Sequence, residues 1–173
     1  VRTRFIELAG EINRSMPGYV VSKVQDCLND DGKALKGARI RILGLSYKAG
    51  IDDMRESPSL ELIHMLEAKG ANVSYHDPYF PEIGPSREYQ DLVGRKTQPL
   101  SETYDCFIIS TVHSCFNAQE ILSYNVPIID TRNFLSDEKE IKKTALSSMA
   151  DIETLLAKKT DHTTQQKNKI ISA

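Results

Sequence analysis

Short apolar runs separated by polar segments recur through the middle of the chain, and their lengths predict buried strands. The runs lie at Ala38–Leu45, Val73–His76, Cys106–Val112 and Val126–Asp130. Ser57–Lys69 instead repeats apolar residues at helical spacing. Ser57 can cap this helix, Pro58 suits its first turn and Gly70 can end it. The middle of the chain therefore alternates strand and helix.

The segments between these runs complete the pattern. Tyr79–Pro99 is rich in proline and glycine, so it is expected to be mostly irregular, with a brief strand near Lys96–Gln98. Ala118–Leu122 is expected to form a short helix. Strands that alternate with helices form right-handed crossovers and a parallel sheet covered on both faces. The pattern predicts a doubly wound, three-layer α/β/α (Rossmann-like) domain with about five parallel strands.

Both ends of the chain differ from this middle. Residues 1–31 are predicted to form a helical arm that is kinked or broken near Pro17. Its apolar stripe includes Phe5, Ile12, Val20 and Val24, and such a stripe needs the domain or a second chain as a partner. No capping residue precedes the arm, which favours a cut inside a longer protein. We expect an α/β domain over residues 32–159 and a polar, disordered tail over 160–173.

Composition removes several classes of function. The formal charge is −2 and no long basic block occurs, which argues against nucleic acid as a partner. No apolar run is long enough to span a membrane. The three cysteines, Cys27, Cys106 and Cys115, follow no ligand spacing, so we expect reduced thiols in the cytoplasm and no metal site.

The segment after the first strand carries the candidate chemistry. It contains Gly44 and Gly50, too few and wrongly spaced for a dinucleotide fingerprint, and five ionisable residues. These ionisable residues are Lys48, Asp52, Asp53, Arg55 and Glu56. Because ligands bind beyond the carboxyl ends of parallel strands, Lys48 and Arg132 are expected to converge on a phosphorylated ligand. The alternative is a solvated network in which Lys48 and Arg55 only pair with the neighbouring acids.

Several motifs in order resemble the C-terminal domain of the UDP-glucose/GDP-mannose dehydrogenase family. They are Gly44-Leu45-Ser46-Tyr47-Lys48, Asp52-Asp53-Met54-Arg55-Glu56-Ser57-Pro58, His76-Asp77-Pro78-Tyr79-Phe80-Pro81 and Asp130-Thr131-Arg132-Asn133. The opening Phe5–Val21 is similar to the central, dimer-forming helix of that family. The stretch YHDPYFPEI is nearest to members that oxidise UDP-N-acetylhexosamines. The resemblance implies a strand order of 3-2-1-4-5 and a homodimer formed through the helical arm.

The resemblance also implies roles for individual residues. Tyr47 and Lys48 would contact a UDP-sugar and Arg132 its UDP portion, while Arg55 would reach toward NAD. Asp53 and Glu56 would hold the two loop cations in place. These enzymes oxidise the C6 alcohol of a nucleotide sugar to a carboxylate with two NAD molecules and a cysteine nucleophile.

The glycine fingerprint and the nucleophile motif of the family are both absent from this sequence. Its own three cysteines are expected to serve packing, so no residue here is assigned a catalytic role. The leading hypothesis is therefore the UDP-sugar-binding part of a longer, NAD-dependent 6-dehydrogenase, inactive by itself. The alternative is a stand-alone nucleotide-binding or regulatory module. A flavodoxin-like receiver domain would need paired acids where Lys48 stands. His113, at a strand end, is expected either to support the site from behind or to lie on the surface, in both cases without touching ligand.

Overall fold

A single parallel sheet organises the domain. The structure is a computed structural model that describes residues 4–51, 53–55, 57–101, 103–135 and 170–172. Its strands are β1 (Arg39–Leu43), β2 (Asn72–His76), β3 (Cys106–Ile109), β4 (Ile128–Asp130) and β5 (Ile170–Ser172). They lie in the order β2-β1-β3-β4-β5, and all pairings between these strands are parallel. The prediction of a parallel α/β fold is confirmed.

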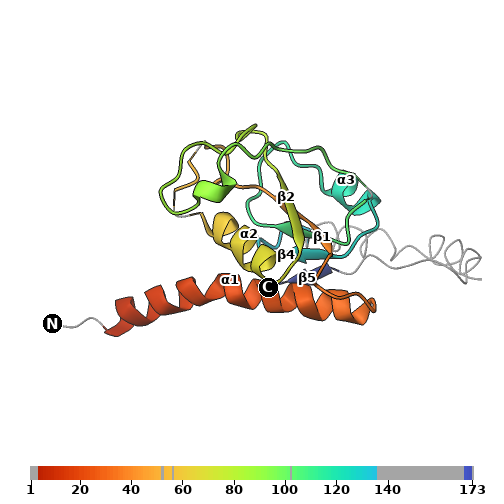
Figure 1. Cartoon of the computed structure of the whole chain (residues 1–173), viewed down its shortest axis with the longest axis horizontal. Coiled ribbons are helices and arrows are strands. Elements are labelled where there is room, and N and C mark those ends of the chain that lie inside the picture. The colour runs from red at the N-terminus through yellow and green to blue at the C-terminus, as the bar shows by residue number, and fades with distance from the viewer. Residues whose placement is uncertain (1–3, 52, 56, 102, 136–169, 173) are drawn as a thin grey trace, which may run out of the picture.

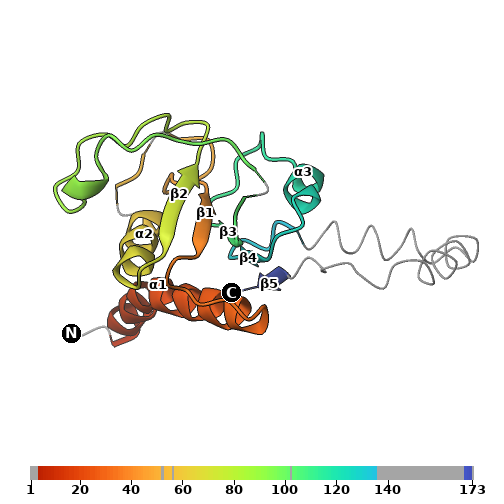
Figure 2. The same cartoon turned by 45° about the vertical axis from the view of Figure 1, so that its right-hand side comes forward.

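Helices cover both faces of this sheet, as Figures 1 and 2 show. The helices are α1 (Arg4–Asp30), α2 (Pro58–Ala68) and α3 (Ala118–Ser123), with a short 3-10 helix η1 at Gln90–Leu92. Alternate residues of β1 point to opposite faces, so Ile40 and Ile42 join the core under α1 and α2. Leu43 joins a second core, which Ile121 of α3 covers. The predicted three layers are therefore present.

The central strand also buries a charged side chain. Arg41 of β1 is only 1% exposed. Its Nη1 donates to the carbonyl oxygens of Tyr75 and Gln98, both at 2.9 Å. Its Nη2 donates to the carbonyl oxygen of Pro99 at 3.0 Å and to the Tyr104 hydroxyl. Burial lowers the pKa of Arg41 to about 10, which leaves it charged at neutral pH. Arg41 thereby fastens the segment around residues 98–104 to the sheet.

The predicted edge strand near Lys96–Gln98 does not form. Lys96 makes an isolated antiparallel bridge with Glu82, and the Gln98 amide donates to the carbonyl oxygen of Tyr75. Pro99 follows directly and has no N–H to continue a ladder. The order 3-2-1-4-5 is therefore wrong at its first position, while the other four strands keep their predicted relative order.

The tail prediction is wrong for residues 170–172, which form β5 beside β4. Ile170 and Ile171 supply two β-branched residues, a composition that fits a pleated edge better than disorder. Residues 160–169 lie outside the described part of the chain.

Helix α1 is continuous through Pro17, so of the two predicted alternatives, a kink or a break, the break is wrong. A proline inside a helix costs roughly 3 kcal/mol. Five apolar side chains after Pro17 are buried against the domain: Val20, Val21, Val24, Cys27 and Leu28. Burial of a large aliphatic side chain contributes roughly 1.5–3 kcal/mol, so this packing outweighs the lost hydrogen bond. The half of α1 before Pro17 extends past α2 (Figure 1).

Candidate functional site: a cleft at the strand ends

The chain leaves β1 through a turn that only glycine can form. Gly44 has a φ of +83°, and a Cβ there would lie 2.1 Å from the carbonyl oxygen of Thr111. Its amide donates to the carbonyl oxygen of His76 at 2.9 Å. The segment after β1 therefore runs close against the ends of β2 and β3, where the predicted ligand crevice lies.

A buried carboxylate fixes the start of the segment that follows. Asp77, 1% exposed, accepts hydrogen bonds at Oδ2 from the amides of Leu45 and Ser46, at 2.6 and 3.1 Å, and from His113 Nε2 at 3.0 Å. Its Oδ1 accepts from the Tyr79 amide at 2.7 Å. Burial favours the neutral acid, but the donors together hold the pKa of Asp77 below its usual value. The carboxylate is thus ionised, and it holds both the backbone of this segment and the His113 side chain.

The first turn of α2 is tied to the same segment. Ser57 caps α2 by accepting from the Ser59 amide at 3.3 Å, and its hydroxyl donates to the carbonyl oxygen of Leu45 at 2.7 Å. The Ser59 hydroxyl donates to the carbonyl oxygen of Gly44 and bonds the Ser110 hydroxyl at 2.7 Å. The ends of β1 and β3 and the start of α2 therefore form one rigid unit.

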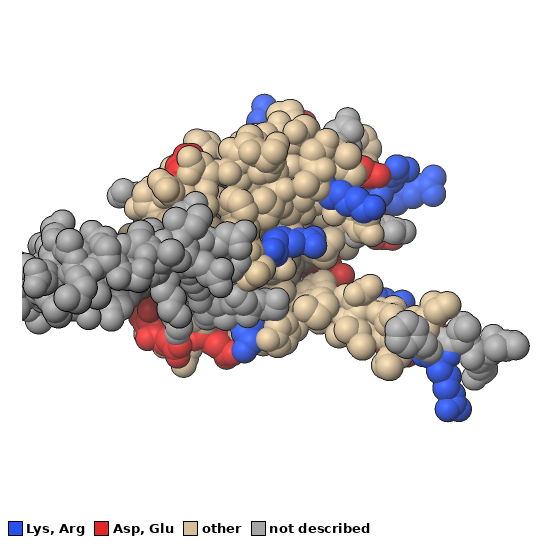
Figure 3. Space-filling view, turned by 180° about the vertical axis from the view of Figure 1, so that it is seen from behind, with Lys and Arg blue, Asp and Glu red and all other residues tan. Residues whose placement is uncertain are grey.

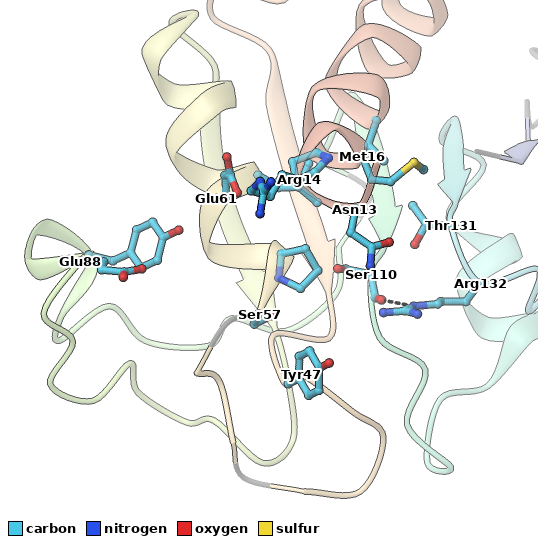
Figure 4. Close-up of a pocket in the computed structure, with 15 residues that line it drawn as sticks. Asn13, Arg14, Met16, Tyr47, Ser57, Glu61, Glu88, Ser110, Thr131 and Arg132 are labelled. Atoms are coloured by element: carbon cyan, nitrogen blue, oxygen red, sulfur yellow. Dashed lines mark hydrogen bonds between the residues drawn. The ribbon is translucent and has the colours of Figure 1, made fainter. Parts of the chain in front are cut away.

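Two of the predicted ligand residues face a cleft of about 690 Å³ at these strand ends. Tyr47, Ser110, Thr131 and Arg132 line it from the sheet, and Asn13 and Met16 are among the residues that line it from α1. Figure 4 shows side chains from α1, α2 and the strand ends gathered around it. An adjoining hollow of about 370 Å³ is lined by Tyr47, Lys48 and Arg132 among others. The structure thus brings all three predicted substrate-binding residues together.

The two cations of this site are held differently. Arg132 is exposed, and its Nε donates to the carbonyl oxygen of Ser110 at 2.5 Å (Figure 4). Its backbone amide donates to Asp130 at 3.0 Å. The Lys48 ammonium lies 5.6 Å from the centroid of the Tyr47 ring. No described carboxylate pairs with Lys48. Of the acids in the alternative solvated network, Asp53 pairs with Arg55, and Asp52 and Glu56 lie outside the described residues. Both cations are available to an anion.

Arg55, predicted to reach toward a cofactor, lies outside this cleft. It makes a two-point ion pair with Asp53, with Nε to Oδ1 at 3.0 Å and Nη2 to Oδ2 at 2.9 Å. The Arg55 hydrogen bonds lower the pKa of Asp53 to about 2. Arg55 borders a separate hollow of about 340 Å³ with Arg87 and Tyr89. Asp53 thus holds Arg55 as predicted, while Asp52 and Glu56 lie outside the described residues.

Sequence reasoning missed the α1 side of the cleft. Asn13, Arg14, Met16 and Pro17 all line it, although α1 seemed only a packing arm. Their position depends on how α1 docks on the sheet, and the spacing of apolar residues does not report that angle. His113 is fully buried, so the surface position that the sequence left open for it is wrong.

Among the described residues, no group of three or more histidine, cysteine, aspartate or glutamate side chains could hold a metal ion. The same residues include no helix that is both long enough and apolar enough to cross a membrane.

Comparison with known proteins agrees with this geometry. Residues 41–137, more than half of the chain, match the model of the UDP-binding domain of the UDP-glucose/GDP-mannose dehydrogenase family. The chain belongs to this family. Like the family resemblance of its motifs, the match covers the cleft residues Tyr47, Lys48 and Arg132.

Relatives of two substrate types are similar to the chain. It is 39% identical over 133 residues to a UDP-glucose 6-dehydrogenase of Rickettsia typhi, covering 73% of this chain and 30% of the relative. It is 34% identical over 143 residues to a UDP-N-acetyl-D-mannosamine dehydrogenase of Methanococcus maripaludis, covering 76% of this chain and 31% of the relative. The solved structure of a UDP-D-ManNAc dehydrogenase from Pyrococcus horikoshii superposes on this chain with a TM-score of 0.60 at 29% identity. The match covers 77% of this chain and 31% of the solved one. The chain therefore spans less than a third of the length of each of these relatives.

Proposed function

We propose that this chain is the nucleotide-sugar-binding portion of an NAD-dependent UDP-sugar 6-dehydrogenase. The observation that carries the proposal is the cleft, where Tyr47, Lys48 and Arg132 meet at the carboxyl ends of parallel strands. Two cations without an acidic partner among the described residues suit a diphosphate, which prefers charge-assisted hydrogen bonds. Membership of a UDP-binding domain family supports UDP as the nucleotide.

In the proposed complex, Lys48 and Arg132 hold the diphosphate and Tyr47 borders the sugar. The bond from Arg132 Nε to the Ser110 carbonyl orients its guanidinium, so its outer nitrogens can face the ligand. The enzyme would oxidise the sugar C6 alcohol to a carboxylate, with NAD supplying the hydride acceptor. Arg55, exposed outside the cleft, is proposed to face that cofactor, most of which a separate dinucleotide-binding domain would hold. No disulfide joins the three cysteines, as expected of a reducing compartment, so we propose that the enzyme is cytoplasmic.

No residue of this chain is proposed as the nucleophile. Cys27 and Cys106 are buried, and burial together with the neighbouring Cys27 thiol raises the pKa of Cys106, which disfavours its thiolate. Cys115 is exposed but borders a hollow with His76 and Phe116, away from Tyr47 and Arg132. We propose that the oxidation itself needs a part of the enzyme outside this chain.

The proposed enzyme is a homodimer assembled through α1. Before Val20 this helix exposes five large apolar side chains: Ile6, Leu8, Ile12, Met16 and Tyr19. The projecting end is mostly uncharged on the face in Figure 3. An apolar surface of this kind on a helix usually marks a protein contact. Sedimentation at several concentrations tests it, and a strict monomer would contradict it.

Calorimetric titration of the purified chain with UDP and with NAD tests the main proposal. We expect weak UDP binding and no measurable NAD binding, because one wall of the substrate site and the NAD fold lie outside the chain. No NADH should form with any UDP-sugar. Failure to bind UDP at millimolar concentration would refute the proposal, as would NADH production that a substitution of one of the three cysteines abolishes. The control is GDP, which keeps the diphosphate and changes the base.

A further inference from the structure

The loop of residues 45–50 carries Tyr47 and Lys48, and we call it the ligand loop. Its start is fixed by Asp77, as described, and by the Thr111 hydroxyl, which donates to the carbonyl oxygen of Ser46 at 2.7 Å. Its far end is the turn at Gly50, with a φ of +74°. Apart from its neighbours in the chain, no described residue has an atom within 4 Å of where a Gly50 Cβ would be, so contacts with the described residues do not pack this turn in place.

One hydrogen bond holds that far end. The Gly50 amide donates to Nδ1 of His113 at 3.2 Å. In the described part of the chain, no other hydrogen bond joins residues 48–51 to the rest of the domain. Residues 47–50 are all exposed, so solvent competes for their backbone groups. On the near side of Lys48, the Tyr47 amide donates to the carbonyl oxygen of Asp53 at 2.7 Å. The position of Lys48 therefore depends on that bond and on the Gly50 bond two residues away.

His113 is built to accept that bond. It is fully buried, and its Nε2 lies 3.0 Å from Oδ2 of Asp77. Because a carboxylate oxygen only accepts, Nε2 carries the proton and Nδ1 keeps its lone pair for the Gly50 amide. The ring packs against Tyr79, with centroids 4.8 Å apart, and edge-on against Phe116 at 5.3 Å. Neither the tautomer nor the orientation of the imidazole is left free.

We propose that His113 is a positioning residue for nucleotide-sugar binding, acting through Nδ1 on Gly50 and so on Lys48 and Tyr47. This inference rests on the proposed function, since it assumes that the ligand loop binds the diphosphate. Asp77 takes part twice: it fixes the start of the loop directly and the far end through His113. The two ends of the loop therefore share one buried carboxylate.

A purely structural His113 would stabilise the fold without affecting the ligand, and a matched pair of variants separates the two roles. In His113→Asn, the amide oxygen can occupy the place of Nδ1 and accept from Gly50, while the bond to Asp77 is lost. In His113→Gln, the amide nitrogen can occupy the place of Nε2 and donate to Asp77, while the Gly50 amide loses its acceptor. Each variant thus removes one of the two hydrogen bonds and keeps the other.

The test is titration of UDP at pH 8, where the terminal phosphate (pKa about 6) is fully ionised. We expect His113→Gln to weaken UDP binding about 5- to 10-fold, the equivalent of one lost hydrogen bond, and His113→Asn to stay within about 3-fold of the unmutated chain. The midpoint temperature of thermal unfolding should be lower in both variants than in the unmutated chain. If affinity falls equally in both variants, or falls in neither, His113 does not position the loop.

A second measurement needs no variant and does not depend on UDP. In nitrogen-15 NMR spectra of the unmutated chain, Nε2 of His113 should carry the proton and Nδ1 should be an unprotonated acceptor. The Gly50 amide should exchange with solvent at least about 10-fold more slowly than the neighbouring Ala49 amide. A proton on Nδ1, or fast exchange at Gly50, overturns the inference. If Nδ1 is unprotonated and Gly50 exchanges slowly but no UDP binds, the proposed function fails. His113 then positions the loop for another ligand.

Discussion

Replacing Lys48 with alanine is the most direct test of the cleft. The Lys48 ammonium lies beside the Tyr47 ring and has no carboxylate partner among the described residues, so its removal breaks no ion pair with any of them. A hydrogen bond to a charged group contributes about 1.5–3 kcal/mol. Loss of one such bond to a diphosphate should weaken UDP binding roughly 10- to 100-fold. Because Lys48 is exposed, we expect the lower end of that range.

Arg55→Ala is the matched control, since it removes the same charge from the same segment. Arg55 pairs with Asp53 and borders a different hollow, so UDP affinity should stay within about 2-fold of the unmutated chain. Calorimetry gives both dissociation constants, and thermal unfolding gives both stabilities. Equal losses of affinity in the two variants would favour a loop network that acts through stability, and the assignment of Lys48 to the diphosphate would be abandoned.

Three further predictions follow from the fold. Gly44→Ala should destabilise the domain by about 2–5 kcal/mol in urea unfolding, because a Cβ would meet a backbone oxygen at a positive φ; a loss below 1 kcal/mol would contradict that contact. Leu28→Ala should cost about 2–5 kcal/mol in the same assay and Leu8→Ala less than about 0.5, both at a concentration where the chain sediments as a monomer, since Leu28 is buried and Leu8 is 54% exposed; similar losses would mean that both ends of α1 pack alike. NMR titration should find Asp53 ionised down to a pH of about 2. A depressed pKa stabilises the fold above the unfolded value of about 3.9, and that stabilisation is lost as the pH falls through the folded value. In Arg55→Ala the pKa of Asp53 should rise; an unchanged value would argue against the ion pair.

Much of the fold could be predicted from local patterns. Four apolar runs became β1 to β4, and Ser57, Pro58 and Gly70 marked the limits of α2 because capping and termination depend on neighbouring residues only. Pro17 misled in favour of a break, since its cost is local while the packing that outweighs it comes from distant residues, mainly those of α2. Arg41 gave no signal at all, because its burial depends on carbonyl groups more than 30 residues away.

The strand-end side of the site could also be predicted from the sequence, whereas its α1 side could not. Tyr47, Lys48 and Arg132 follow strands, and the topology of a parallel sheet brings strand ends together whatever the details. Asn13 and Arg14 could not be predicted, because α1 contributes to the cleft only through its docking position. The bond between His113 and Gly50 joins two loops whose approach no spacing rule describes.

The cleft is assembled from nearly the whole length of the described domain, from Asn13 on α1 to Arg132 after β4. A ligand that bridges these walls holds together parts of the chain that are otherwise joined mainly by core packing. Its binding energy therefore adds to the stability of the native state, by about 2.7 kcal/mol at a concentration one hundred times the dissociation constant. The half of α1 before Pro17 is exposed, so its unwinding would remove part of one wall of the cleft while the packed half stayed in the core. Occupancy of the cleft thus reports on α1, and a nucleotide would protect this helix from proteolysis before it measurably protected the sheet.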